Sequence, residues 1–430
     1  MIAIAEPRTK LDAQRIPLTP NYPPFKKWKR SAIGEKLQDR PMCLYLHIPF
    51  CTQRCSFCYY KTVDLKERPE LDPYVDALCK EIKLVADRFD LGNRPIHAIY
   101  FGGGTPSLLQ EHHFEKLVGT LRENFKQFDN HQQFALEAEP LTISKSKLET
   151  LAQLGVTRLS MGIQSFVEDI IQLSGRGHNQ KQAYRAIEMA QKAGQGKWTI
   201  NIDLLSGLAG ETDETWKKSV ECAIGTGVES ITVYQMEAFT NTDFYKQGVR
   251  EEKINLPDAE QEKGFMQYAM GELTRQNYIP WSFFTYTKNN SDRSEYIYNI
   301  WQGMEFYGLG VSAFGSMDNF LLQNTSDLDK YGEIVNAGEL PLVRGYKFTC
   351  QDLMVRDVLL GMKLLRFDLN KFKSQYGFKL ESLCAQPLGQ LEAEGFITIG
   401  NDEVTLTDKG ILHGDFVGYT VSEYLRKLHS

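Results

Sequence analysis

The feature that most constrains this chain is a short loop with three cysteines, Cys51, Cys55 and Cys58, at spacings of four and three residues. The loop follows residues 44–50, an apolar run that predicts a buried strand. Closely spaced thiolates are soft ligands typical of iron–sulfur, zinc or copper(I) sites. Zinc usually needs a fourth protein ligand from a second pair of Cys or His, and the other cysteines stand alone in the sequence. The spacing therefore favours a cubane iron–sulfur cluster with one open iron over three structural thiols.

The composition indicates an ordinary globular protein. The 430 residues suffice for two or three domains, and the formal charge of −6 gives no electrostatic case for nucleic acid. No apolar run approaches the roughly 20 residues that span a bilayer, and the first residues lack the pattern of a signal peptide. Because the cysteines are too few and too clustered for a disulfide scaffold, we expect a reducing, cytoplasmic location.

From residue 44 onward, strand and helix patterns alternate. Strands are predicted at residues 97–101, 134–138, 158–163, 199–205 and 229–235, and helices at residues 72–88, 144–154, 180–193 and 212–225. This alternation predicts a parallel sheet of about six units with its helices outside. The chemically active residues then fall at the carboxyl ends of the strands.

We divide the chain into four segments. Residues 1–41 form an N-terminal arm, 42–285 a barrel, 286–345 a glycine-rich segment returning to the active site, and 346–430 a winged-helix-like cap. Residues 25–30 of the arm are basic and aromatic, a composition that is also found in segments that contact a membrane surface or an anionic ligand. We favour a solvated arm over either contact. The last segment is not basic, so a cap over the substrate is favoured over DNA binding.

The cysteine loop resembles the C-x-x-x-C-x-x-C signature of the radical S-adenosylmethionine superfamily. Residues 45–51 and 57–58 resemble its branch of oxygen-independent coproporphyrinogen III oxidases, heme chaperones and class C methyltransferases. The resemblance runs from about residue 42 to the C-terminus. It implies an α/β fold, with a partial (β/α)6 barrel and a mostly helical, winged-helix-like C-terminal domain. It also implies a 4Fe–4S cluster on the three cysteines, S-adenosylmethionine (SAM) on the open iron, a flavodoxin- or ferredoxin-type electron donor and a monomer.

The resemblance further assigns residues to SAM. Gly103, Gly104 and Thr105 follow a predicted strand, where glycines let a ligand approach and expose N–H groups. Arg176 is expected to bind a carboxylate in bidentate fashion, and Asp203 to accept ribose hydroxyls. In the pair of acids before Pro140, Glu137 is favoured over Glu139. The full set of expected cofactor contacts is Tyr45, Phe57, Gly103, Gly104, Thr105, Glu137, Gln164, Arg176, Asp203, Ala313 and Phe314.

Position 60 departs from the pattern of the oxidases that this loop resembles. Their signature is C-x-x-x-C-x-x-C-x-C, with a fourth cysteine where this chain has Tyr60. The departure favours a class C methyltransferase, in which a second SAM lies beside Phe57, near Tyr60, Gly104 and Phe314. Phe57 and Tyr60 are then the expected catalytic residues. The expected substrate is an aromatic small molecule, first a menaquinone ring and second a porphyrin-like ring, with residues 26–30 bringing the enzyme to a membrane. The alternatives are an oxygen-independent coproporphyrinogen III oxidase and a heme chaperone.

Overall fold

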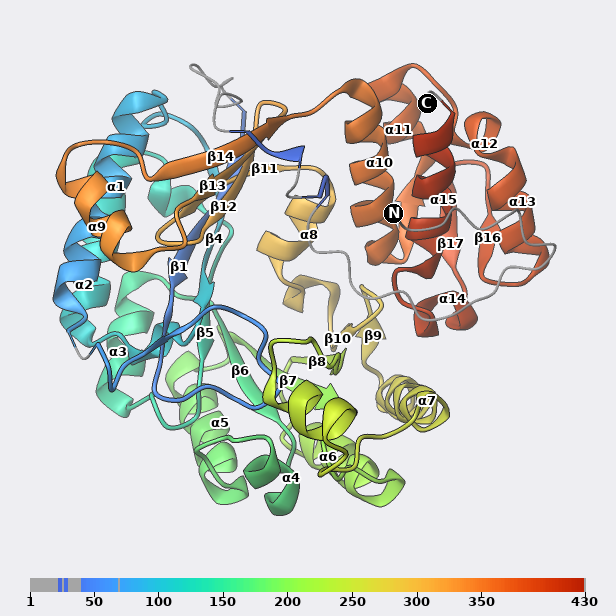
Figure 1. Ribbon diagram of the computed structural model, residues 1–430, viewed down its shortest axis with the longest axis horizontal. Helices are drawn as coiled ribbons and strands as arrows, with labels where there is room; N and C mark the ends of the chain where they lie inside the picture. The colour runs from blue at the N-terminus through green and yellow to red at the C-terminus, as the bar shows by residue number, and fades with distance from the viewer. Residues whose placement is uncertain (1–21, 25–26, 30–39, 69, 429–430) are drawn as a thin grey trace.

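A 12-stranded sheet forms the centre of the molecule in this computed structural model, which describes residues 22–24, 27–29, 40–68 and 70–428 (Figure 1). Its strand order is β14-β13-β12-β11-β1-β4-β5-β6-β7-β8-β10-β9. Six consecutive strands in this order pair in parallel: β1 (Met42–Ile48), β4 (Ile96–Gly103), β5 (Gln133–Ala138), β6 (Arg158–Gln164), β7 (Thr199–Ser206) and β8 (Ser230–Gln235). Their side chains are largely buried, as expected of a parallel sheet covered on both faces. The predicted sheet of six units is confirmed.

Helices cover the outer face of these strands (Figure 1). They are α1 (Asp72–Arg88), α2 (Glu111–Asn124), α3 (Lys145–Leu154), α4 (Glu168–Leu173), α5 (Gln180–Gly194), α6 (Asp213–Gly225) and α7 (Ala259–Arg275). Local sequence sets their ends. Ser144 caps α3 by accepting a hydrogen bond from the Lys147 amide, and Gly155 ends it in the left-handed conformation. Each connection returns the chain to the same edge of the sheet, so the strands' carboxyl ends lie together.

Residues 286–345, the segment predicted to return to the active site, extend the sheet at both ends together with the short strands just before them. Next to β8 lie the short antiparallel strands β10 (Thr285–Thr287) and β9 (Ile279–Pro280), which are followed by α8 (Glu295–Trp301). Next to β1 lies β11 (Glu305–Leu309), and β12 (Phe314–Met317), β13 (Phe320–Asn324) and β14 (Leu342–Lys347) follow antiparallel, with α9 (Leu328–Asn336) between the last two. Within the described ranges, β14 and β9 stay at opposite ends, so the barrel is open.

Residues 350–428, called here the C-terminal unit, have a hydrophobic core of their own. Its helices are α10 (Cys350–Gly361), α11 (Leu369–Tyr376), α12 (Leu380–Leu383), α13 (Ala385–Ala393), α14 (Asp408–Leu412) and α15 (Phe416–Lys427). Its strands β15 (Arg366–Asp368), β17 (Glu403–Leu406) and β16 (Ile397–Ile399) form a three-stranded sheet in that order. The mostly helical C-terminal region is confirmed, while the four segment boundaries stay a prediction.

The described part of the N-terminal arm packs on the body of the protein. Trp28 is buried, donates its indole N–H to the Pro23 carbonyl at 2.9 Å and packs edge-on against Phe314. Lys29 exchanges backbone hydrogen bonds with Gly345. Because Trp28 is buried within the protein, it does not anchor the predicted membrane contact. Lys26 and Arg30, two basic residues of that prediction, lie outside the described residues. No described helix combines the length and apolar character needed to cross a membrane.

Candidate active site

A cavity of about 730 Å³ lies between the carboxyl ends of the parallel strands and the C-terminal unit. All of the predicted site residues except Ala313 and Phe314 line it. Its wall also includes residues from the β9–β10 connection, from α8 and from residues 411–415 of the C-terminal unit. The cavity thus joins parts of the chain that are far apart in sequence.

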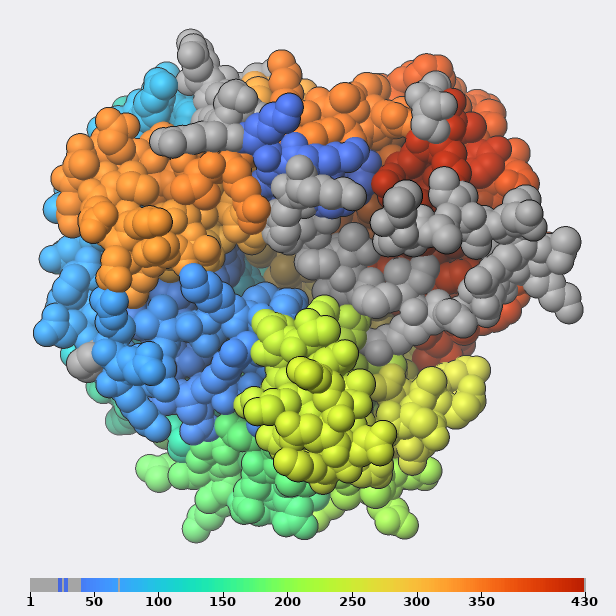
Figure 2. Space-filling model, viewed as in Figure 1, coloured from blue at the N-terminus to red at the C-terminus, as the bar shows by residue number. Residues whose placement is uncertain are grey.

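The cysteine loop connects two short strands, β2 (Phe50–Cys51) and β3 (Val63–Asp64), and is held by backbone contacts on several sides. Ser56 donates its amide to the Ser174 carbonyl, and its own carbonyl accepts the Phe244 amide, each at 3.0 Å. The side chain of Arg54 bonds the Cys58 and Asn241 carbonyls. Figure 2 shows the yellow-green segment that contains residues 241–244 lying against the blue segment of the cysteine loop. The loop is therefore fixed before any ligand binds.

The three thiols of the loop are a donor set that fits an iron–sulfur cluster. Cys51, Cys55 and Cys58 are free and line one cavity. Burial raises the pKa of Cys51 to about 11 and also raises the pKa of Cys58. Because only thiolates bind iron, assembly of a cluster releases these protons. Thr105 donates its hydroxyl toward the Cys51 sulfur at 3.6 Å.

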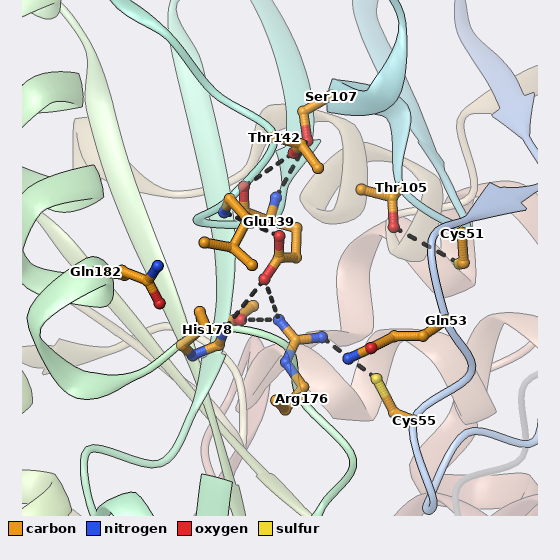
Figure 3. Close-up of polar contacts among 12 residues, drawn as sticks. Cys51, Gln53, Cys55, Thr105, Ser107, Glu139, Thr142, Arg176, His178 and Gln182 are labelled. Carbon is orange, nitrogen blue, oxygen red and sulfur yellow. Dashed lines mark hydrogen bonds and ion pairs between the residues drawn. The ribbon is translucent and has the colours of Figure 1, made fainter. Parts of the chain in front are cut away.

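Arg176 connects this loop to a carboxylate, as Figure 3 shows. Its Nη1 lies 3.5 Å from the Cys55 sulfur, and its Nη2 lies 3.8 Å from Glu139 and donates to the Gly162 carbonyl. His178 Nδ1 lies 3.0 Å from the same Glu139 carboxylate. Burial raises the pKa of Glu139, but the hydrogen bond with His178 and the charge of Arg176 together hold it below its ordinary value. Glu139 therefore stays charged and positions Arg176 beside a cluster ligand.

The expected bidentate contact between Arg176 and a SAM carboxylate is not prepared in this structure. Both terminal nitrogens of Arg176 already donate to the chain, and its Nε has no hydrogen-bond partner among the described residues. The contact of Arg176 with SAM stays a prediction. The role of Glu139 was missed, because only the tertiary structure brings it to Arg176 and His178.

The N–H groups at the end of β4 are paired within the chain rather than exposed to a ligand, contrary to our expectation. Gly104 and Thr105 donate their amides to the Ile48 and Phe50 carbonyls at 2.7 and 2.8 Å. A Cβ at Gly104 would lie 2.6 Å from the Phe50 oxygen, and Gly103 has a φ of +119°. The triplet is required because β4 passes directly against the strand that leads into the cysteine loop.

Glu137 and Asp203 lie on the cavity wall and are held by polar neighbours. Glu137 accepts hydrogen bonds from the Tyr100 hydroxyl at 2.8 Å and the Gly103 amide at 3.0 Å, and burial raises its pKa to about 7. Asp203 accepts from Asn201 at 2.8 Å and Ser160 at 3.2 Å, and burial raises its pKa to about 6. Gln164, at the end of β6, has a φ of +68°, a strained value that is often found at binding sites.

Ala313 and Phe314 do not reach the cavity, which corrects the expectation that they close it. Phe314 begins β12 and packs at 5.9 Å between ring centroids on Trp28, in a cluster with Leu321 and Phe348. The reason is topological, since β12 pairs with β11 and β13 on the outer side of β1. A second SAM beside Phe57 therefore has no Phe314 to cover it.

Sequence reasoning missed the aromatic wall of the cavity. Tyr59 stacks on Tyr60 at 4.2 Å between ring centroids and lies 4.3 Å from Phe239. Further residues come from the β9–β10 connection, from α8 and from the C-terminal unit: Trp281, Phe283, Phe284, Trp301, Ile411, Leu412, Gly414 and Asp415. No motif marks these residues, because they converge only when the C-terminal unit packs on the barrel.

Comparison with known proteins identifies the fold and a radical SAM domain. Residues 45–223 match the family model of the radical SAM superfamily. The chain is 28% identical to the heme chaperone HemW of Bacillus subtilis (87% of this chain, 97% of the relative). It is 27% identical to the oxygen-independent coproporphyrinogen III oxidase of Salmonella typhimurium (90% and 87%). The solved structure of the coproporphyrinogen III oxidase HemN of Escherichia coli matches with a TM-score of 0.78 at 23% identity, covering 94% of this chain and 96% of that one.

These comparisons correct the predicted function. Methylation of an sp² carbon, with a menaquinone ring as the first substrate, is wrong, because these full-length relatives are coproporphyrinogen oxidases and a heme chaperone. The second SAM stays a prediction. The predicted 4Fe–4S cluster and SAM are confirmed as the cofactors of the family. Residues 45–223 thus form a radical SAM domain, and over most of its length the chain is similar to coproporphyrinogen III oxidases and to a heme chaperone.

Proposed function

We propose that this radical SAM enzyme acts on a porphyrin-like tetrapyrrole, with oxidative decarboxylation of a propionate side chain, as in coproporphyrinogen III oxidation, as its reaction. The observation that carries the proposal is the cavity itself. Its volume of about 730 Å³ lies in the upper part of the range typical of small-molecule sites, and aromatic rings line it opposite the cysteine loop. Relatives named for coproporphyrinogen III oxidation and for heme match this chain over most of its length.

A reduced 4Fe–4S cluster held by the cysteine loop would supply the electron for reductive cleavage of SAM, the chemistry that allows hydrogen to be removed from an unactivated carbon of the substrate. The residues of the chain do the rest. Cys51, Cys55 and Cys58 would hold the iron, and Arg176 donates to the Cys55 Sγ from a position set by Glu139. Glu137 and Asp203 offer acceptors to the amino group and the ribose of SAM. Residues 411–415 of the C-terminal unit wall the cavity and limit access of water to the reacting atoms.

The proposal is tested with protein reconstituted anaerobically with iron and sulfide, a flavodoxin-type electron donor, SAM, coproporphyrinogen III and a one-electron acceptor. The acceptor takes the electron that remains on the substrate after the loss of a hydrogen atom and carbon dioxide. We expect 5′-deoxyadenosine together with a tetrapyrrole that has lost carbon dioxide, both followed by mass spectrometry. The Cys51/Cys55/Cys58→Ser variant provides the background. Deoxyadenosine at the background level with intact tetrapyrrole would reject the decarboxylation.

A heme chaperone is the second candidate, and Tyr60 favours it specifically. The signature of the oxidases has a cysteine at this position, whereas here Tyr60 stacks on Tyr59 at the cavity wall. The match to the Bacillus subtilis chaperone also covers 97% of that protein. Stoichiometric heme retained through gel filtration, without SAM-dependent change of the heme, would support this candidate over the first.

A further inference from the structure

The part of the cavity nearest the C-terminal unit contains a buried donor without a partner. Trp281 lines the cavity, is only 9% exposed, and its Nε1 makes no hydrogen bond with any described residue. Two other buried tryptophans, Trp28 and Trp216, donate their Nε1 to carbonyls at 2.9 and 2.7 Å. Buried N–H groups are almost always paired, so the exception at the wall of a cavity indicates a place for a ligand acceptor.

The position of Trp281 is set by backbone hydrogen bonds of the β9–β10 connection and by neighbouring rings. Its backbone amide bonds the Thr285 carbonyl at 3.1 Å, which closes the tight β9–β10 connection. The Ser282 hydroxyl accepts the Thr285 amide within the same connection at 3.1 Å. The Trp301 ring lies 6.4 Å away between centroids, and Phe284 meets Trp301 edge-on at 5.6 Å. We call Trp281, Phe283, Phe284, Trp301, Leu412 and Asp415 the aromatic subsite.

The charges of the aromatic subsite are balanced. Asp415 forms a buried ion pair with Lys363, whose Nζ lies 5.3 Å from the Phe283 ring centroid and 5.8 Å from that of Trp301. The pair therefore adds no net charge, but it places an ammonium group behind two of the rings. The cysteine end of the cavity is different, because charged groups of both signs line it: the carboxylates Glu137, Glu139 and Asp203 and the guanidinium groups of Arg54, Arg158 and Arg176.

This contrast distinguishes the two ends of the cavity. At the cysteine end, the carboxylates suit the amino group of SAM, and the arginines suit the carboxylates of SAM and of the propionate that reacts. The aromatic subsite offers flat apolar rings for stacking and one indole N–H for an acceptor. A tetrapyrrole has both elements, since its pyrrole rings carry carboxylate side chains.

We propose that the aromatic subsite binds a carboxylate-bearing ring of the tetrapyrrole, with the Trp281 indole N–H donating to the carboxylate. This inference rests on the proposed function and adds the orientation of the substrate. A second ring of the same molecule then lies toward the cysteine loop, where the reaction takes place. Trp281 is accordingly a specificity-determining residue, contributed by an antiparallel edge strand connection rather than by the parallel strands.

The test measures binding of coproporphyrin III, a stable oxidised probe, to the reconstituted protein by porphyrin fluorescence anisotropy. Trp281→Phe keeps an aromatic ring but removes the donor, and Trp198→Phe removes the indole N–H of another buried tryptophan, in the barrel core, as a matched control. We expect Trp281→Phe to weaken binding about tenfold or more, as for loss of a hydrogen bond to a charged group, and Trp198→Phe to leave it within about twofold. Both variants should retain wild-type iron content, which reports folding.

A second arm compares coproporphyrin III with its tetramethyl ester. The wild type should prefer the free acid, and Trp281→Phe should lose most of that preference, whereas a purely structural role of Trp281 would weaken both probes equally. Wild-type affinity in Trp281→Phe would overturn the inference and leave the proposed function intact. No binding of either probe by the wild type would reject the tetrapyrrole proposal and, with it, the aromatic subsite.

Discussion

At the scale of single residues, the cavity combines a soft donor set with a fixed cation. Arg176 reaches the Cys55 sulfur while Glu139 and Gly162 hold its other nitrogen, so its position does not depend on a bound ligand. A positive charge at this distance favours the thiolate and hence the cluster. Two predictions follow from the chemistry of individual side chains in this region.

The first prediction concerns the cluster. Replacing Cys51, Cys55 and Cys58 together with serine should abolish iron binding on anaerobic reconstitution, because hydroxyls are poor ligands for the soft iron–sulfur core. Cys350, exposed and outside the loop, gives the control, and its serine variant should bind iron as the wild type does. Iron and sulfide analysis with absorption spectroscopy makes the measurement. Iron at the wild-type level in the triple variant would disprove the assignment.

The second prediction concerns pH. Burial raises the pKa of Glu137 to about 7, so its carboxylate, expected to bind the SAM amino group, is lost as the pH falls through that value. SAM affinity should fall about fivefold to tenfold between about pH 7.5 and pH 6, measured by equilibrium dialysis. Glu137→Gln should bind weakly at both values without this step, whereas the exposed Glu115→Gln should keep the wild-type profile. An unchanged step in Glu137→Gln would mean that another group titrates.

At the scale of elements, a buried carboxylate joins α1 to the β11–β12 connection and to α9. Glu81 is fully buried and accepts the Gly310 amide at 2.7 Å, the Asn324 amide group at 2.6 Å and the Tyr331 hydroxyl at 2.6 Å. The neighbouring Tyr74 donates its hydroxyl to the His47 carbonyl on β1 at 2.6 Å. This network supports β1, the strand that leads into the cysteine loop.

The third prediction is that Glu81→Ala destabilises the protein by roughly 3 kcal/mol or more, because three buried donors lose their acceptor. Tyr331→Phe removes one donor and keeps the other two bonds, so it should cost only about 1 kcal/mol. Urea unfolding followed by circular dichroism gives both values. Equal costs for the two changes would show that Glu81 is not the centre of this network.

At the scale of the whole molecule, the C-terminal unit completes the cavity that the barrel leaves open. The ion pair of Lys363 and Asp415 is buried at this junction, beside the rings of Phe283 and Trp301. Burial lowers the pKa of Lys363, and the charge of Asp415 partly offsets the effect. The junction is thus apolar except for one compensated pair.

The fourth prediction follows from this compensation. Asp415→Leu should destabilise the protein by about 3–5 kcal/mol, because it leaves the buried Lys363 ammonium without its carboxylate. The double variant Lys363→Met/Asp415→Leu should recover most of this loss, since an apolar pair of similar volume replaces the ions. The midpoints of urea unfolding of the single and double variants provide the comparison. A double variant no more stable than the single one would show that the pair is not coupled.

The sequence by itself determined the parallel sheet, the cysteine loop and the cofactors. Hydrophobic periodicity and capping residues are local, and so they placed α1 and α3 correctly. The loop's spacing brings three thiols together whatever the rest of the chain does. Most residues predicted around SAM, such as Glu137 and Asp203, line the cavity because parallel strands end at one edge.

Only the tertiary structure decided what depends on contacts between distant segments. Glu139 reaches Arg176, Phe314 turns away from the cavity on β12, and Trp281 meets the C-terminal unit because of strand order and domain packing, which leave no short-range pattern. The reaction predicted from the sequence was also wrong, because Tyr60 shows that one thiol is missing and says nothing about the shape of the site. The wall of the cavity is assembled from the β9–β10 connection, α8 and the C-terminal unit, and so it exists only in the folded chain.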